Sequence, residues 1–153
     1  MTAHQANRVG AWLLRVSLGV IFIAHSLYLK LAVFGLPGTA QYFASIGLPE
    51  FLAYVVFLAE ALGGIALILG AYVRVAALLL VPVALGATWA HLGSGWLFQN
   101  PGGGWEYPLF LAAALLVQFF IGDGVAALRG SPRLSGAAPQ PSPGSDVAAE
   151  GSE

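Results

Sequence analysis

The sequence predicts an all-α polytopic membrane protein: a bundle of four transmembrane helices with a short interfacial helix in the first outer loop. The first observation behind this prediction is composition. Of the 153 residues, 58% are hydrophobic and 8% are charged, whereas about 25% of residues are charged in an average soluble domain. So few charges do not cover the surface of a water-soluble protein of this size. The excess apolar surface is therefore expected to face lipid.

The second observation is that the apolar residues fall into four stretches. Each has about the 20 residues that a helix needs to cross the hydrocarbon core of a bilayer. The expected spans are Ala11–Leu31, Phe51–Leu69, Val73–Leu92 and Tyr107–Leu128. Residues 70–72 alone separate the second and third spans, which is typical of a tight helical hairpin. We expect residues 11–129 to form one membrane domain.

The loop after the first span is long and apolar, and residues 38–47 within it predict a short helix. Gly47 is expected to end this helix and Pro49 to open the second span, because glycine is enriched just after helices and proline in their first turn. We expect the short helix to lie at the membrane interface as a cap over the bundle.

The basic residues predict the orientation of the chain. One expected face carries Arg8, Arg15, Arg74, Arg129 and Arg133, and only Lys30 lies toward the other face. Basic residues concentrate on the cytoplasmic side of membrane proteins, so we expect both termini to lie in the cytoplasm. Residues 130–153 are rich in Ser, Pro, Gly and Ala. This composition predicts a disordered cytoplasmic tail.

Several classes of function are excluded or disfavoured by composition. The net charge is −1 without a basic cluster, so nucleic acid is not an expected partner. The chain has no cysteine, which excludes disulfides, thiolate metal sites and a thiol relay within it. The glycine-rich residues 93–105 lack the lysine and the flanking strand of a phosphate-binding loop. Nucleotide binding is therefore not indicated.

Two ionisable residues are predicted inside spans. A charge at the centre of a span costs about 2.5–3.5 kcal/mol, so Arg15 in the first span and Glu60 in the second each need a partner or a role. Two interpretations stay open: the two residues pair and hold the spans together, or Glu60 handles protons. Gly63 and Gly64 follow Glu60 and predict a small-residue face on which another helix packs closely.

His25, Lys30, His91 and Glu106 are expected near the outer leaflet, although they are far apart in sequence. Imidazole and carboxylate groups relay protons near neutral pH, and a lysine holds an anionic oxygen. This set suits a redox headgroup that gains protons with electrons, or a small anion. The simpler alternative is that each histidine is an ordinary interfacial residue. The candidate catalytic residues are His25, Lys30, Glu60, His91 and Glu106.

Aromatic residues near the last loop are candidates for holding a flat ring. Trp96, Trp105 and Tyr107 are the candidate cofactor-binding residues. Pro82 interrupts the third span, and the resulting kink is expected to open a cavity between helices. Haem and metal are not expected, because the two histidines differ in depth and no metal-ligand spacing is present.

These residues carry a resemblance to a known family. The runs that match it are Arg15–His25 with Lys30-Leu31, Gly47-Leu48-Pro49, Glu60-Ala61-Leu62-Gly63-Gly64, Leu69-Gly70, Arg74–Leu78, His91, Gly95-Trp96 and Gly103–Leu109. In this order and spacing, residues 11–129 resemble the DoxX family. Ser26 departs from its pattern, which commonly has glycine after the histidine. The resemblance implies a four-helix plasma-membrane protein. Related members are membrane subunits of a thiosulfate:quinone oxidoreductase or assemble with soluble redox-defence enzymes.

The leading hypothesis is a bacterial inner-membrane subunit of a quinone-linked oxidoreductase. Quinone is then the expected cofactor, and soluble or membrane redox subunits are the expected partners, in addition to the lipid bilayer and with homo-oligomer formation left open. The second hypothesis is a non-enzymatic membrane scaffold that anchors soluble redox-defence partners. A third, a small-molecule transporter, is disfavoured because four short helices enclose little volume.

Overall fold

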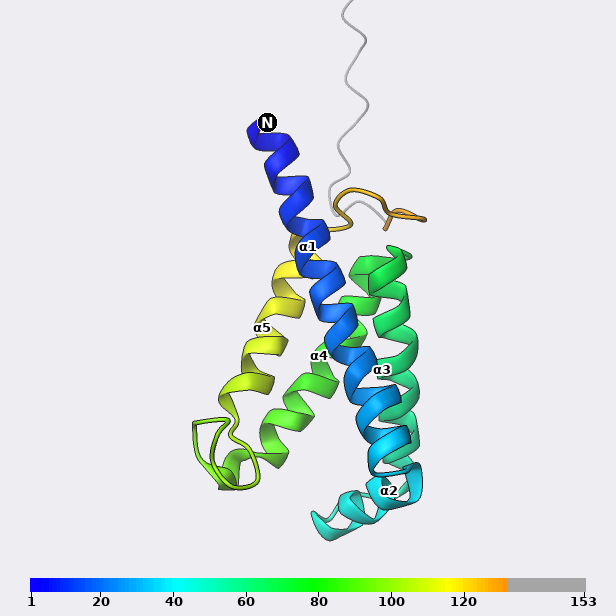
Figure 1. Cartoon of the computed structure of the whole chain (residues 1–153), viewed down its shortest axis with the longest axis vertical. Coiled ribbons are helices and arrows are strands. Elements are labelled where there is room, and N and C mark those ends of the chain that lie inside the picture. The colour runs from blue at the N-terminus through cyan, green and yellow to red at the C-terminus, as the bar shows by residue number, and fades with distance from the viewer. Residues whose placement is uncertain (132–153) are drawn as a thin grey trace, which may run out of the picture.

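The computed structural model describes residues 1–131, and every helix in this part belongs to one bundle (Figure 1). Its elements are α1 (Ala3–Ile23), the π-helix η1 (Ala24–Val33), α2 (Leu36–Ser45), α3 (Phe51–Leu69), α4 (Val73–Ala90), the 3₁₀ turn η2 (Leu92–Ser94) and α5 (Glu106–Ile121). The predicted all-α class is confirmed. All but the first two residues of the predicted tail lie outside the described residues.

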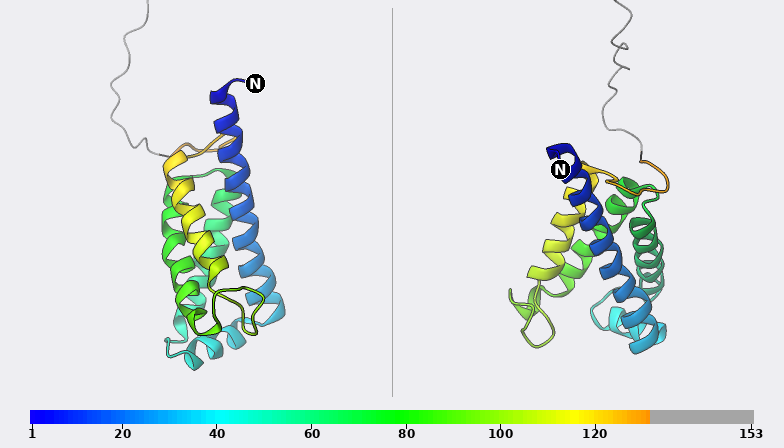
Figure 2. Two further views of the ribbon diagram at one scale, coloured as in Figure 1. Left: turned by 90° about the vertical axis from the view of Figure 1, so that its left-hand side faces the viewer. Right: turned by 45° about the horizontal axis from the view of Figure 1, so that its top comes forward.

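The four long helices run lengthwise, and α2 lies across the end of the bundle opposite the N-terminus (Figures 1 and 2). Within residues 1–131, three segments are long and apolar enough to cross a membrane, namely Ala3–Val33, Phe51–Leu69 and Val73–Ala90. The fourth, α5, is apolar but has only 16 residues. Helix α3 has the bounds predicted from hydropathy, and α2 lies where a short helix is predicted.

The first helix begins at Ala3 and not at Ala11, which corrects the predicted span. The early start has a local cause. The Thr2 backbone N–H donates to Gln5 Oε1 at 2.9 Å, and the Gln5 N–H donates to Thr2 Oγ1 at 3.3 Å. This reciprocal capping box satisfies two N–H groups that a helix start leaves unpaired. Hydropathy identifies only the apolar part of a helix, so it does not predict the polar turns of α1 before Ala11.

The last helix ends at Ile121 and not at Leu128, which corrects the fourth predicted span. Gly122 follows with a φ of 82°, a conformation that glycine adopts without steric cost. The Gln118 side-chain nitrogen donates to the Gly122 carbonyl at 2.6 Å. The chain then turns and crosses the end of the bundle.

Residues 122–131, the crossing segment, join the termini of three helices. The Leu128 N–H donates to the Leu69 carbonyl at 3.3 Å, and the Tyr72 N–H donates to the Arg129 carbonyl at 3.2 Å. The buried Arg15 guanidinium donates to the Ala126 carbonyl at 3.2 Å. The N-terminus, the α3–α4 turn and the crossing segment therefore share one end of the molecule (Figure 2). Of the five arginines predicted to share one side of the membrane, four lie at this end of the bundle. The fifth, Arg133, lies outside the described residues.

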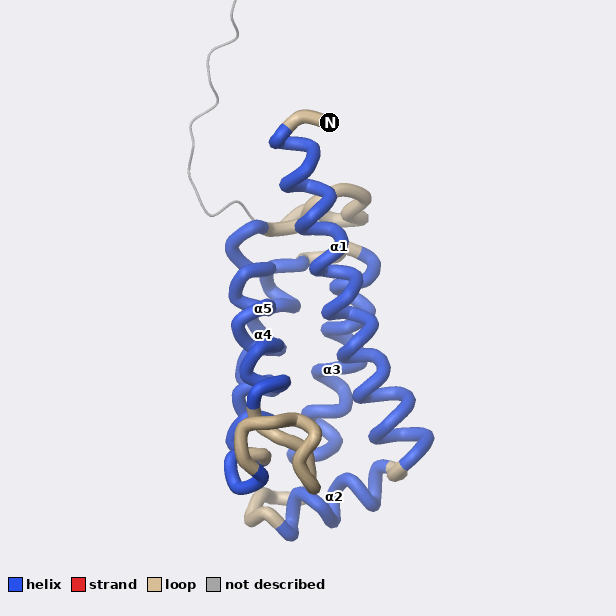
Figure 3. Tube along the Cα trace, turned by 60° about the vertical axis from the view of Figure 1, so that its left-hand side comes forward, coloured by secondary structure: helices blue, strands red, loops and turns tan. Residues whose placement is uncertain are grey.

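The apolar core fills the half of the bundle nearest the α3–α4 turn. Its largest members are Leu18, Phe22, Leu67, Leu80, Leu111 and Leu115. Helix α1 packs mainly on α3 and α4 mainly on α5, so the bundle consists of two helix pairs (Figure 3). Contacts between α3 and α4 join the pairs.

Small residues allow α1 and α3 to approach closely. A Cβ added at Gly19 would lie 2.8 Å from the Gly64 carbonyl oxygen, and one added at Gly64 would lie 3.0 Å from the Gly19 oxygen. A Cβ at Gly63 would meet the Leu80 side chain of α4 at 2.9 Å. The predicted small-residue face is therefore confirmed as a packing surface for two neighbouring helices.

Candidate functional site

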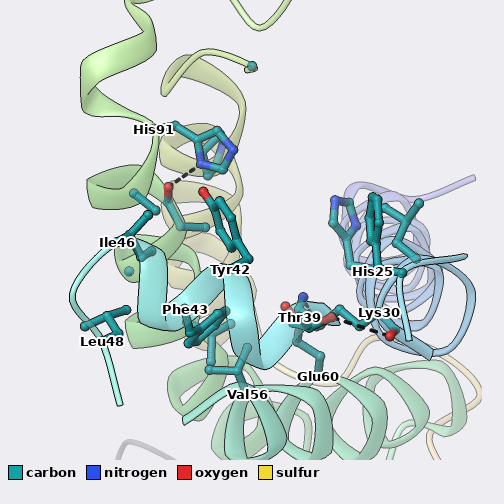
Figure 4. Close-up of a pocket in the computed structure, with 18 of the residues that line it drawn as sticks. His25, Lys30, Thr39, Tyr42, Phe43, Ile46, Leu48, Val56, Glu60 and His91 are labelled. Carbon is teal, nitrogen blue, oxygen red and sulfur yellow. Dashed lines mark hydrogen bonds and ion pairs between the residues drawn. The ribbon is translucent and has the colours of Figure 1, made fainter. Parts of the chain in front are cut away.

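A cavity of about 910 Å³ occupies the half of the bundle that the core leaves free (Figure 4). Its walls come from η1, α2, α3, α4, the α4–α5 loop and α5, and they are mostly apolar. This volume lies within the range of about 300–1,000 Å³ that is typical of ligand pockets. Pro82 and Gly86 line it on α4. A cavity is thus present beside Pro82, as the sequence predicts.

An ion pair lies in the wall of this cavity. Lys30 Nζ lies 2.6 Å from Glu60 Oε2, and the two side chains are 17% and 6% exposed. Glu60 sits midway along α3, so Lys30 reaches inward from the end of η1 to meet it. A charge removed from water is tolerated when it is paired and hydrogen-bonded. The Arg15–Glu60 pairing considered from the sequence is wrong, because Arg15 bonds to the crossing segment at the other end.

The π-helix η1 places two of the predicted residues on one face. Its backbone bonds join residues five apart, as in the 2.9 Å bond from the Phe34 N–H to the Leu29 carbonyl. Residues three or four apart are neighbours on an α-helix, whereas wider turns bring residues five apart together. His25 and Lys30 are five apart, and both line the cavity. π-Helical turns are frequent at functional sites.

The two histidines of the cavity are held in the same way. His25 Nδ1 lies 2.9 Å from the Ile21 carbonyl oxygen, and His91 Nδ1 lies 2.7 Å from the Ala87 carbonyl oxygen. Each carbonyl belongs to the residue four positions earlier in the same helical segment. The rings line the cavity from η1 and from the end of α4, on different sides of it (Figure 4). The His25 ring also stacks on the ring of Tyr107, with centroids 6.3 Å apart.

Helix α2 supplies a wall that we did not predict as part of a site. Its Thr39, Tyr42 and Phe43 and the following residue Ile46 line the cavity. Their spacing of three, four and seven residues is that of one helical face. This periodicity is the sequence signal from which the wall could have been predicted. The Thr39 hydroxyl donates to the Gly35 carbonyl at 3.0 Å and so does not need a ligand.

Three predicted site residues do not join the cavity. Glu106 Oε1 accepts a 3.0 Å bond from the Phe98 N–H and thereby closes the α4–α5 loop. Trp96 and Trp105 pack edge to face on each other, with centroids 4.4 Å apart. Glu106 and Trp96 line a separate, more open groove. The structure thus brings together His25, Lys30, Glu60, His91 and Tyr107.

Glycines bring the α4–α5 loop against His91. Gly102 and Gly103 have φ values of 86° and 77°, which favour glycine. A Cβ at Gly103 would lie 3.2 Å from His91 Cδ2. The glycine-rich loop therefore forms tight turns at the end of the bundle, as expected from the sequence, and fits closely around the imidazole.

Comparison with known proteins identifies the family. The DoxX family model matches residues 10–93, which include His25, Lys30, Glu60 and His91. A protein of Bacillus subtilis (strain 168) named "Putative oxidoreductase CatD" is 40% identical over 84 residues, which are 55% of this chain and 60% of that protein. The match therefore spans less than two thirds of this relative's length, and no solved structure matches. Because the family model covers more than half of the chain, the chain belongs to the DoxX family.

Proposed function

We propose that this chain is the membrane subunit of a quinone-linked oxidoreductase and that its cavity holds the quinone headgroup. The observation that carries the proposal is one apolar cavity that contains the Lys30–Glu60 ion pair and two histidines held by backbone carbonyls. The similarity to a protein named as an oxidoreductase supports the same class of chemistry.

The cavity suits a quinone in size and in chemistry. A quinone headgroup is a flat apolar ring with two oxygens, and its isoprenoid tail is apolar. Mostly apolar walls around a few polar groups are the usual form of a site for such a ligand. Lys30 has further N–H groups to donate to an oxygen, and Glu60 Oε1 is outside the ion-pair contact. The transporter hypothesis was disfavoured because four short helices enclose little volume, and the cavity of about 910 Å³ corrects that reason.

Each polar residue of the cavity has its own role in the proposed reaction. Reduction of a quinone to a quinol takes two electrons and two protons, and oxidation releases them. His25 and His91 exchange the protons, Lys30 orients an oxygen, and Glu60 holds or relays charge. The chain has no cysteine to carry electrons, so the electrons pass to or from a partner redox subunit.

The membrane placement is part of the proposal. Helix α5 is the fourth span: its 16 residues extend about 24 Å at about 1.5 Å per residue, and it packs along α4. The arginine-rich end, with both the N-terminus and the crossing segment, faces the cytoplasm. Helix α2 then lies at the outer interface of the bacterial plasma membrane, and the headgroup binds on this outer side.

Co-purified quinone tests the proposal. The full chain is purified in mild detergent, and quinone is extracted and quantified for wild type, His91→Ala and the control His4→Ala, which changes an exposed residue of α1. We expect close to one quinone per chain in wild type and control, and a clear loss in His91→Ala. Quinone at the level of an unrelated membrane protein in all three would overturn the proposal and favour the scaffold.

A further inference from the structure

We propose that the cavity binds the reduced, dihydroxy form of its ring ligand in preference to the oxidised, dicarbonyl form. The inference rests on the proposed function and adds to it the redox state of the ligand for which the site is built. It follows from how the backbone fixes the tautomer of the two histidines that line the cavity.

The backbone bonds decide which ring nitrogen carries the proton. A carbonyl oxygen only accepts hydrogen bonds. The nitrogen that lies 2.9 Å from the Ile21 carbonyl must therefore donate, and so must the nitrogen 2.7 Å from the Ala87 carbonyl. In both His25 and His91 this nitrogen is Nδ1. A neutral imidazole with its proton on Nδ1 has a lone pair on Nε2, so its other nitrogen is an acceptor.

The acceptor nitrogens are available to a ligand. Neither His25 Nε2 nor His91 Nε2 makes a hydrogen bond within residues 1–131. Both rings line the cavity, and Nε2 lies on the edge of the ring away from the bonded Nδ1. The same arrangement on two different helices gives the cavity two acceptors on different sides (Figure 4).

The two forms of the ligand meet these acceptors differently. A ring hydroxyl donates to Nε2 and can still accept a bond from the Lys30 ammonium group. A quinone carbonyl accepts from Lys30 but turns a lone pair toward the lone pair of Nε2. A polar group that loses its partner on binding weakens affinity. Lys30 therefore serves both redox forms, and His25 and His91 distinguish between them.

Anaerobic calorimetric titration of the purified full chain measures this preference. The probes are decylubiquinone and decylubiquinol, after the endogenous quinone has been washed out. Wild type is expected to bind the quinol at least about tenfold more tightly, as two additional hydrogen bonds predict. His25→Phe and His91→Phe each keep a flat ring and remove the acceptor, so each is expected to lower the ratio. His4→Phe, outside the cavity, is expected to leave it unchanged.

The outcomes separate this inference from the proposed function. Equal binding of both forms, or tighter binding of the quinone, overturns the inference and leaves quinone binding intact. Binding of neither form overturns both. A ratio that His25→Phe and His91→Phe leave unchanged also overturns the inference, because another group would then set the preference.

A measurement without ligand covers the case in which the phenylalanine variants fold poorly. ¹⁵N chemical shifts of the imidazoles in wild-type protein report which ring nitrogen carries the proton. We expect the Nδ1–H tautomer for His25 and His91, assigned by the loss of each signal in His25→Gln and His91→Gln. The Nε2–H tautomer at both positions would overturn the inference, because Nε2 would then donate and favour the carbonyl form.

Discussion

At the scale of the residue, the Lys30–Glu60 pair is the feature that separates a functional site from simple packing. Glu60 is buried and Lys30 is largely buried. Buried ion pairs contribute little net stability, and replacing both partners with apolar residues is often neutral or stabilising. Packing alone therefore does not explain the two charges. Their position in the cavity wall fits a role in holding a ligand.

Variants at the pair test this interpretation. Glu60→Gln leaves the Lys30 charge without its partner and is expected to destabilise the protein by about 3–5 kcal/mol. The double variant Lys30→Met with Glu60→Met is expected to regain most of this stability and still to lose bound quinone. Thermal unfolding in detergent and quinone content per chain measure the two effects. Full quinone content in the stable double variant would show that the pair has no part in binding.

The sequence identifies the residues of the site better than their partners. Glu60, His25 and His91 stand out because polar groups are rare within apolar spans. Arg15 was the partner of Glu60 considered from the sequence and Lys30 was not, because spacing along the chain does not give the direction of long side chains. Glu106 was grouped with the site by its depth, and the structure uses its carboxylate to close a loop.

At the scale of the element, helix contacts and helix ends follow from glycines. Gly70 ends α3 in the left-handed conformation, with a φ of 73°. It directly follows the apolar run from which the end of α3 was predicted at Leu69. The end of α5 at Gly122 was missed, because residues 122–128 remain fairly apolar and hydropathy does not report backbone conformation. The π-helix η1 was also missed, since an apolar run has the same composition in either helix type.

Glycine substitutions test the helix contacts. Gly19→Ala places a methyl group 2.8 Å from the Gly64 oxygen and is expected to lower the free energy of unfolding by about 1–3 kcal/mol through overpacking. Gly10→Ala, in the same helix with nothing within 4 Å, is the matched control and is expected to stabilise by about 0.5–1 kcal/mol. Chemical unfolding in mixed micelles compares them. Equal stability of the two variants would refute close packing of α1 on α3.

At the scale of the whole molecule, the apolar core and the cavity occupy different halves. The core and the crossing segment hold together the arginine-rich end, and the cavity lies toward α2. The all-α class and the helix order were predictable. The low content of charged residues indicates a lipid environment, and the lengths of the apolar runs indicate which segments are helices that cross it. The cavity was not predictable in size or lining, because it depends on how four helices splay apart at one end.

The absence of cysteine makes the proposed topology directly testable. His4→Cys and Ser45→Cys each introduce one exposed thiol, the first near the N-terminus and the second at the end of α2. A membrane-impermeant maleimide is expected to label Ser45→Cys in intact spheroplasts and His4→Cys only in inverted vesicles. Mass spectrometry quantifies the label. Labelling of both thiols from the same side would contradict the orientation in which α2 covers the outer end.

Photolabelling tests the central claim, that the cavity between η1, α2 and α4 is the quinone site, most directly. An azido-quinone is bound to the purified full chain, activated by light and mapped by mass spectrometry, with excess decylubiquinone as competitor. The account predicts competitor-sensitive labels confined to residues that line the cavity, above all in residues 25–30, 39–46 and 82–91. Labels spread over the lipid-facing helix surfaces and insensitive to the competitor would contradict it.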